Sequence, residues 1–116
     1  MIARLSTVVL DTPDPHALAR FYAELLDLPI TKVDPDWIDI GDGASRISFQ
    51  LAPHHIPPQW PDPSYPQQLH LDIWVDDIDA AESHVLRLGA QLLSTKEPGF
   101  RVYSDPAGHP FCLEYD

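Results

Sequence analysis

Apolar and polar residues alternate along several short stretches of this chain, which is the pattern of strands buried on one face. In two other stretches the apolar residues recur every three or four positions, which indicates amphipathic helices. These helical patterns begin directly after Asp14 and Asp77. Each aspartate can cap a helix because its carboxylate accepts hydrogen bonds from free backbone N–H groups. We therefore expect an α+β fold.

The same order of patterns occurs twice. Residues 7–14 read Thr-Val-Val-Leu-Asp-Thr-Pro-Asp and residues 70–77 read His-Leu-Asp-Ile-Trp-Val-Asp-Asp. Both segments lead from a strand into a helix, and position 70 follows position 7 at an offset of 63. The repeat predicts a duplicated module, and a cleft shared by two related halves is a common place for a ligand.

The first copy is expected to hold one strand, one helix and three further strands. The first strand covers 3–10, and the helix starts at Pro15, where the missing donor of proline is tolerated. The remaining strands cover 30–33, 37–40 and 46–51, separated by turn-forming Pro, Asp and Gly residues. This order is βαβββ.

The second copy repeats that order. A strand over 69–75 leads to a helix that Gly89 ends, and strands follow at 91–95, 100–104 and 110–115. We predict one domain, 1–116, made of module one (1–52), a connector (53–66) and module two (67–116). The connector holds six of the 13 prolines together with Trp60, which suggests a lid or a dimer contact.

Charge and composition narrow the class of protein. The net charge is −11, from 18 acidic and 7 basic residues, and no Lys/Arg cluster is present, so we expect no nucleic-acid partner. The acidity either favours solubility or attracts cationic ligands. No apolar run could cross a bilayer, and the start of the chain lacks the features of a secretory signal. A single cysteine fits a reducing compartment, so we expect a cytoplasmic protein without membrane contacts.

The alternation of side chains divides each strand into two faces. In the second copy Leu71, Ile73 and Val75 suit a helix, which leaves His70, Asp72 and Trp74 on the other face. By the same parity the polar faces also receive the following residues: Thr7 and Gln50 from module one, and Cys112 and Glu114 from the last strand. If these faces line one concavity, it has the mixture of aromatic and polar groups typical of a small-molecule pocket.

Three motifs together resemble a known group of proteins. They are Asp14-Pro15 leading to Phe21-Tyr22, His70 followed by Val75-Asp76-Asp77, and Tyr103-Ser104-Asp105-Pro106-Ala107-Gly108-His109-Pro110-Phe111. They resemble the vicinal-oxygen-chelate superfamily, which includes glyoxalase I, extradiol dioxygenases and the bleomycin and fosfomycin resistance proteins. The resemblance implies paired βαβββ modules that make a cup-shaped mixed sheet with the helices on its outer face. It also implies a homodimer and a ligand held inside the cup.

Metal-dependent members of this superfamily carry ligands at four inward positions, commonly His, Gln and Glu. By resemblance these positions are Thr7, Gln50, His70 and Cys112, and the chain departs from the pattern at three of them. We therefore expect no catalytic metal or other cofactor. If a divalent ion binds, the resemblance implies His70, Gln50 and a shifted Glu114 as its ligands, whereas Cys112 would favour a softer ion.

Individual residues of this group allow more than one interpretation. His70 is either a hydrogen-bonded residue of the cup or a metal ligand, and with Asp72 it could carry out acid–base chemistry. Cys112 is most simply a buried packing residue, because an activated thiolate needs a cationic neighbour.

Two classes of function follow. The first is a protein of the bleomycin-resistance type that binds a small polar or cationic molecule without a catalytic metal, with Trp74 stacking on the ligand. The second is a metal-dependent lyase, isomerase or dioxygenase of the glyoxalase type. A structural homodimer without ligand is a third. The predicted ligand-binding residues are Thr7, Gln50, His70, Asp72, Trp74, Cys112 and Glu114. The sequence assigns neither a substrate nor catalytic residues.

Overall fold

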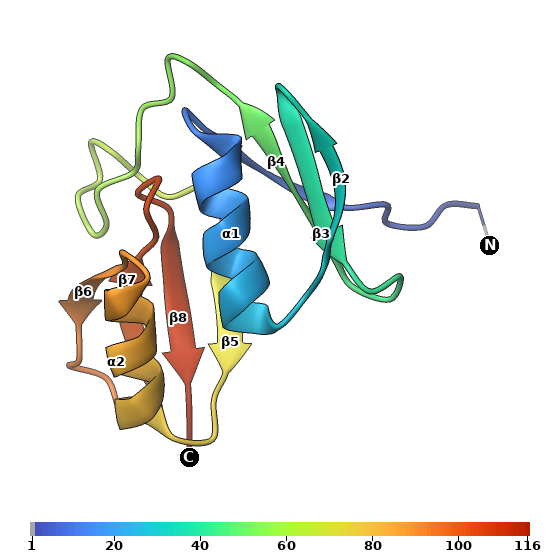
Figure 1. Cartoon of the computed structure of the whole chain (residues 1–116). Helices are drawn as coiled ribbons and strands as arrows, with labels where there is room; N and C mark the ends of the chain where they lie inside the picture. Colours follow the sequence, from blue (N-terminus) through green and yellow to red (C-terminus); the bar gives the residue numbers. More distant parts are fainter. Residues whose placement is uncertain (1) are drawn as a thin grey trace. The chain divides into compact units, whose positions relative to one another are not determined.

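A computed structural model describes residues 2–116 of the chain, which form two compact units that divide between His55 and Ile56. Each unit holds one four-stranded sheet and one helix (Figure 1). In both sheets one strand pair is parallel and the other pairs are antiparallel. The predicted α+β fold with two tandem βαβββ modules is confirmed. Over the described part of the chain, no helix has the length and apolar character needed to span a membrane.

The first unit contains five elements. They are β1 (Val8–Thr12), α1 (Pro15–Leu26), β2 (Ile30–Asp34), β3 (Trp37–Gly41) and β4 (Arg46–Leu51), and the sheet order is β1-β4-β3-β2. The prediction of a first strand over 3–10 is wrong, since β1 begins and ends later. Its parallel partner β4 pairs from Ile47 to Leu51 with Val8 to Thr12, so the residues before Val8 have no strand beside them.

Helix α1 covers one face of the first sheet. Asp14 caps it through a 3.1 Å bond from the N–H of Ala17 to its carboxylate, as predicted. Leu18 and Tyr22 on one side of the helix are buried, and the ring of Tyr22 stacks on Phe49 of β4 with centroids 5.9 Å apart. Burial of such large apolar side chains supplies most of the stabilisation of a sheet covered by a helix. It also leaves the opposite face of β4 free for other contacts.

The second unit repeats this arrangement with the order β5-β8-β7-β6. Its elements are β5 (Leu71–Trp74), α2 (Ile78–Arg87), β6 (Gln91–Ser94), β7 (Phe100–Ser104) and β8 (Pro110–Glu114). Asp77 accepts a 3.1 Å bond from the N–H of Ala80, which reproduces the cap at Asp14. Gly89 follows the last helical turn with φ +110°, as expected of a glycine that ends a helix.

A polar cluster joins α2 to the adjacent face of β7. Arg101 lies 2.9 Å from Glu82 and 3.2 Å from Asp79, and the Tyr103 hydroxyl donates a 3.0 Å bond to Glu82. Burial raises the pKa of Tyr103, and the nearby Glu82 carboxylate adds a smaller increase. These contacts fix Arg101 and Tyr103 on the helix side of the second sheet, so their neighbours Phe100 and Val102 lie on the other side.

The proline-rich segment packs within the second compact unit from Ile56 onward. Backbone bonds of 2.8 Å and 3.1 Å tie Gln59 to Tyr65 and Tyr65 to Asp62, which closes a short loop that carries Trp60. Pro57 lies against Gly108, where an added Cβ would come within 2.5 Å of the proline Cβ. The segment is thus docked on the turn that precedes β8. That both modules form one domain stays a prediction.

The turn between β7 and β8 depends on one buried carboxylate. Asp105 is buried, and its Oδ1 accepts hydrogen bonds of 2.9 Å from the N–H of Ala107 and 3.0 Å from that of His109. Asp105→Ala should lower the free energy of unfolding by about 1–3 kcal/mol, because two partly buried N–H donors lose their acceptor. Asp105→Asn keeps an acceptor oxygen and should lose clearly less. Urea unfolding of both variants measures the difference, and equal losses would show that the bonds to Oδ1 are unimportant.

Candidate ligand-binding site

The face of the second sheet that points away from α2 carries most of the predicted site residues. In the parallel pair of β5 and β8, Asp72 lies beside Cys112 and Trp74 beside Glu114. Neighbouring residues of a strand point to opposite faces, and Leu113 on the helix side is fully buried. We call the face with Asp72, Trp74, Cys112 and Glu114 the distal face. The sequence prediction that these residues share one face is confirmed for this module.

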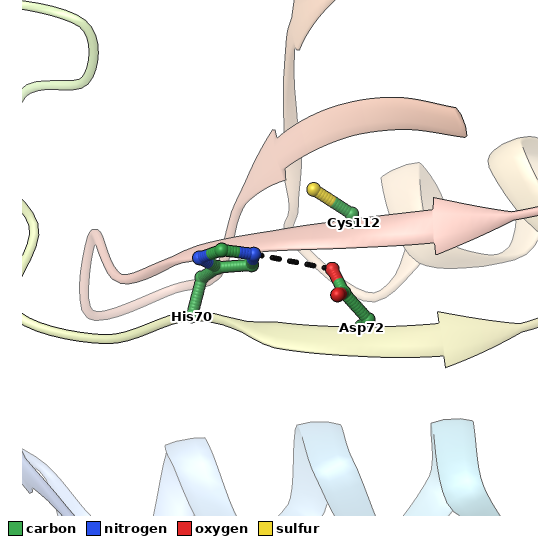
Figure 2. A group of neighbouring side chains, drawn as sticks. All are labelled: His70, Asp72 and Cys112. Atoms are coloured by element: carbon green, nitrogen blue, oxygen red, sulfur yellow. Dashed lines mark ion pairs between the residues drawn. The ribbon is translucent and has the colours of Figure 1, made fainter. Parts of the chain in front are cut away.

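Three side chains converge at one end of the distal face (Figure 2). His70 Nε2 lies 3.2 Å from Asp72 Oδ1, and Cys112 Sγ lies near both, with all three donor atoms within 4.8 Å of one another. The His70 and Asp72 side chains are 39% and 50% exposed, whereas Cys112 is 8% exposed. A ligand can therefore reach the imidazole and the carboxylate, while the thiol is buried next to them.

Cys112 lacks the surroundings of a reactive thiolate. Burial is the main cause that raises the pKa of its thiol to about 11, and the carboxylates of Asp72 and Glu114 add smaller increases. Burial, together with the Asp72 and Glu114 carboxylates, therefore holds the thiol in its protonated form. The group of three is not arranged as a nucleophile with a base. The interpretation of Cys112 as a buried residue is confirmed.

Alkylation of Cys112 should accordingly be slow. With a pKa of about 11, roughly one thiol in ten thousand is ionised at pH 7. The rate of reaction with iodoacetamide should rise up to about pH 11, and Asp72→Asn should shift this profile to lower pH because a negative neighbour is removed. Mass spectrometry of quenched samples follows the single cysteine. Fast alkylation at pH 7 of the folded wild type would contradict this description.

A small pocket adjoins these side chains. Its volume is about 190 Å³, and the lining consists of Trp60, Gln67, His70, Phe100, Val102, Pro110 and Cys112. The docked connector places Trp60, which the sequence suggests for a lid or a dimer contact, in the pocket wall. Most of the lining is apolar, and His70 and Gln67 supply the polar groups, which is the usual composition of a small-molecule pocket.

The corresponding face of the first sheet carries a closed hydrogen-bond network. The hydroxyls of Thr7 and Ser48 lie 2.7 Å apart, and Ser48 donates a 2.5 Å bond to Asp39. The same carboxylate oxygen of Asp39 accepts a 2.7 Å bond from the indole N–H of Trp37. Ser48 is fully buried. The polar groups of Thr7 and Ser48 are thus satisfied by one another and by Asp39.

Strand pairing changes one equivalence between the modules. Val9 lies beside Ser48 in β1 and β4, as Asp72 lies beside Cys112 in β5 and β8. The counterpart of Cys112 is therefore Ser48, and Gln50 corresponds to Glu114. The constant offset of 63 maps Cys112 onto Phe49, which faces the helix, because the second copy has one more residue before its last strand. Counting from each strand's partner, rather than from the helix cap, would have found Ser48.

These positions do not fit the metal centre that the resemblance implies. They supply one imidazole, the protonated thiol of Cys112, and the hydroxyls of Thr7 and Ser48, which bond to each other. A hard divalent ion prefers carboxylate oxygens, and a catalytic zinc site usually has three good nitrogen or oxygen ligands. His70, Asp72 and Cys112 are the residues that could hold a softer ion, but the thiol would first have to lose its proton.

Comparison with known proteins settles the family. The family model described as a glyoxalase-like domain matches residues 7–114, nearly the whole chain. The chain belongs to the glyoxalase-like domain family. The resemblance to the vicinal-oxygen-chelate superfamily is thereby confirmed. No curated protein sequence matches this glyoxalase-like chain significantly.

Solved structures show the same fold at low identity. A glyoxalase/bleomycin resistance protein/dioxygenase family enzyme from Burkholderia phytofirmans PsJN has a TM-score of 0.76 at 20% identity, covering 97% of this chain and 98% of that one. A fosfomycin resistance protein from Mesorhizobium loti has a TM-score of 0.70 at 18% identity, covering 100% and 94%. The bleomycin-binding protein of Streptomyces verticillus, solved with copper(II)-bleomycin, has a TM-score of 0.60 at 20% identity, covering 100% and 99%. The glyoxalase-like fold thus occurs in one protein described as an enzyme, one described as a resistance protein and one described as a binding protein.

Proposed function

We propose that this glyoxalase-like protein binds a small organic cation on the distal face of its second module, without a catalytic metal. The observation that supports this proposal most directly is that an exposed indole lies beside two carboxylates. Trp74 is 56% exposed, its neighbour in β8 is Glu114, and Asp72 precedes it by two residues on the same face. An aromatic ring attracts an alkylammonium group through its negative π-face, and adjacent carboxylates add to that attraction.

The charge of the second unit supports a cationic ligand. From Ile56 to Asp116 the chain holds ten acidic side chains and three basic ones. One of the three basic side chains, Arg101, forms ion pairs with Glu82 and Asp79 on the helix side of the sheet. A surface of one sign raises the local concentration of oppositely charged ligands.

His70 has a positioning role in this proposal. Its contact with Asp72 Oδ1 orients that carboxylate, and the Asp72 side chain is exposed enough for a ligand to reach it. The alternative function is a metal-dependent lyase, isomerase or dioxygenase using His70, Gln50 and Glu114. These residues offer one imidazole, one amide oxygen and a single carboxylate, which is a weak ligand set for a hard divalent ion. We therefore favour binding. Ligand-binding roles of Thr7 and Gln50 stay sequence predictions and are not part of the proposed cation site. The homodimer and the cytoplasmic location are kept as expectations.

Calorimetric titration with a pair of matched compounds tests the proposal. Choline and 3,3-dimethylbutan-1-ol share the same shape, but only choline carries a charge. We expect choline to bind at least about tenfold more tightly, since a cation–π contact at an exposed indole contributes on the order of 0.5–1 kcal/mol and each charge-assisted contact with Asp72 or Glu114 about 1 kcal/mol. Trp74→Leu should remove the cation–π part of this preference, a factor of about two to five. Equal affinity for the two compounds, or no binding of a wider set of amines, would overturn the proposal.

The same titration separates binding from metal chemistry. Protein dialysed against EDTA should bind choline as tightly as untreated protein, because the contacts come from Trp74, Asp72 and Glu114. A loss of binding that Mn²⁺, Ni²⁺ or Zn²⁺ restores would favour the metal-dependent alternative instead.

A further inference from the structure

A second and larger pocket adjoins the His70 pocket in the same unit. Its volume is about 420 Å³, and it is lined by Trp60, Pro61, Leu93, Ser94, Lys96, Glu97, Phe100 and Val102. Trp60, Phe100 and Val102 also line the His70 pocket, so these three side chains form a shared wall. The two cavities are therefore neighbouring compartments on one face of the second sheet.

The lining of the larger pocket differs in character from the acidic distal face. Two aromatic rings and the apolar side chains of Leu93 and Val102 dominate it. Its two charged residues, Lys96 and Glu97, have opposite signs, so the pocket has no net charge to attract an ion. Aromatic side chains bind flat apolar groups by offset stacking or edge-to-face contact, in addition to the area that they bury.

Local backbone structure explains how the walls are held. The pairing of β6 with β7 shifts between Leu92 and Ser94, which marks a bulge, and Leu93 lies within it. A bulge redirects a side chain that regular alternation would place elsewhere. On the opposite wall, the loop closed by the bonds between Gln59 and Tyr65 carries Trp60. Local backbone structure therefore positions both walls of the larger pocket without a bound ligand.

We infer that the ligand of this protein is amphipathic: a cationic head on the distal face and an uncharged aromatic arm in the pocket between Trp60 and Leu93. This inference rests on the proposed function, because the cationic head is taken from it. The His70 pocket connects the two parts: His70 and Cys112 line it and lie within 4.8 Å of Asp72 on the distal face, and Trp60, Phe100 and Val102 join it to the larger pocket. One molecule can therefore place its head near Asp72 and its arm in the larger pocket. The class of ligand is thus an aromatic amine or aryl-alkylammonium compound rather than a small polar metabolite.

Three probe compounds measure the contributions of the aromatic arm and the cationic head to binding separately. They are choline, which has only the head, (2-naphthylmethyl)trimethylammonium, which has both, and 2-naphthylmethanol, which has only the arm. The naphthyl ammonium compound should bind about tenfold or more tightly than choline, as expected for one stacked aromatic group. Trp60→Ala should abolish this gain. Leu93→Ser, on an exposed strand of the opposite wall, should reduce the gain without risk to the fold.

Tyr65→Ala serves as the control, because Tyr65 belongs to the same loop but lies outside both linings. It should leave the gain intact. If the naphthyl compound binds no better than choline, or if its gain survives both Trp60→Ala and Leu93→Ser, the inference is wrong while the cation site stands. If 2-naphthylmethanol binds through Trp60 and choline does not bind, the aromatic pocket is supported and the proposed cation site fails.

Discussion

Gly108→Ala is expected to lower the free energy of unfolding of the second unit by about 2–5 kcal/mol. Gly108 has φ +88°, a conformation that L-residues adopt at a cost of about 1–2 kcal/mol. In addition, its new Cβ would lie 2.5 Å from the Cβ of Pro57, so the docked connector would have to shift. Overpacking of this kind typically costs about 1–3 kcal/mol.

Gly99→Ala is the matched control for that substitution. Gly99 has the same φ of +88°, but the nearest atom to an added Cβ, the carbonyl oxygen of Tyr115, is 3.9 Å away. It should lose only the conformational contribution. Urea unfolding followed by circular dichroism gives both values, and equal losses would show that the contact with Pro57 contributes nothing. Gly108→Ala should also weaken binding of the naphthyl probe, because the connector that moves carries Trp60.

Removal of both carboxylates from the distal face should have the largest effect on binding. The double variant Asp72→Asn with Glu114→Gln should bind choline about 10- to 100-fold more weakly, since each charge-assisted contact contributes on the order of 1 kcal/mol at a partly exposed site. The remaining affinity should come from Trp74 and should depend little on salt. Calorimetry at two salt concentrations measures both effects.

A second double variant controls for net charge. Glu24→Gln with Asp36→Asn removes two charges from exposed positions of the first unit. It should leave the affinity for choline within about twofold of wild type if local contacts dominate over the overall field. If both double variants weaken binding equally, the acidity of the chain, rather than the site around Trp74, attracts the ligand.

The fold could be predicted because its signals are local. The N-cap aspartates, the glycine after α2 and the alternation in β4 and β5 each specify their element through interactions within a few residues. The start of β1 could not be predicted, since its extent depends on where the distant strand β4 begins. Residues 3–7 read as strand-forming, but no partner lies beside the residues that precede Val8.

The site was predictable only in part. Parity along β5 placed His70, Asp72 and Trp74 together, because neighbouring residues in a strand alternate faces. The role of Ser48 depends on pairing between strands. The resemblance instead implies Gln50, two residues later, as the counterpart of Cys112. Trp60 and Leu93 depend on how the connector docks and where a bulge falls, and neither feature has a distinctive local pattern.

The most direct test of the central claim is to locate bound choline in solution. We would record two-dimensional ¹H–¹⁵N spectra of the labelled, EDTA-treated protein during titration with choline. The account predicts that the indole N–H of Trp74 and the backbone amides of 70–74 and 112–114 shift together, with one affinity, while those around Thr7 and Ser48 stay unchanged. Shifts centred on Thr7 and Ser48, or shifts that appear only after a divalent metal ion is added, would contradict it.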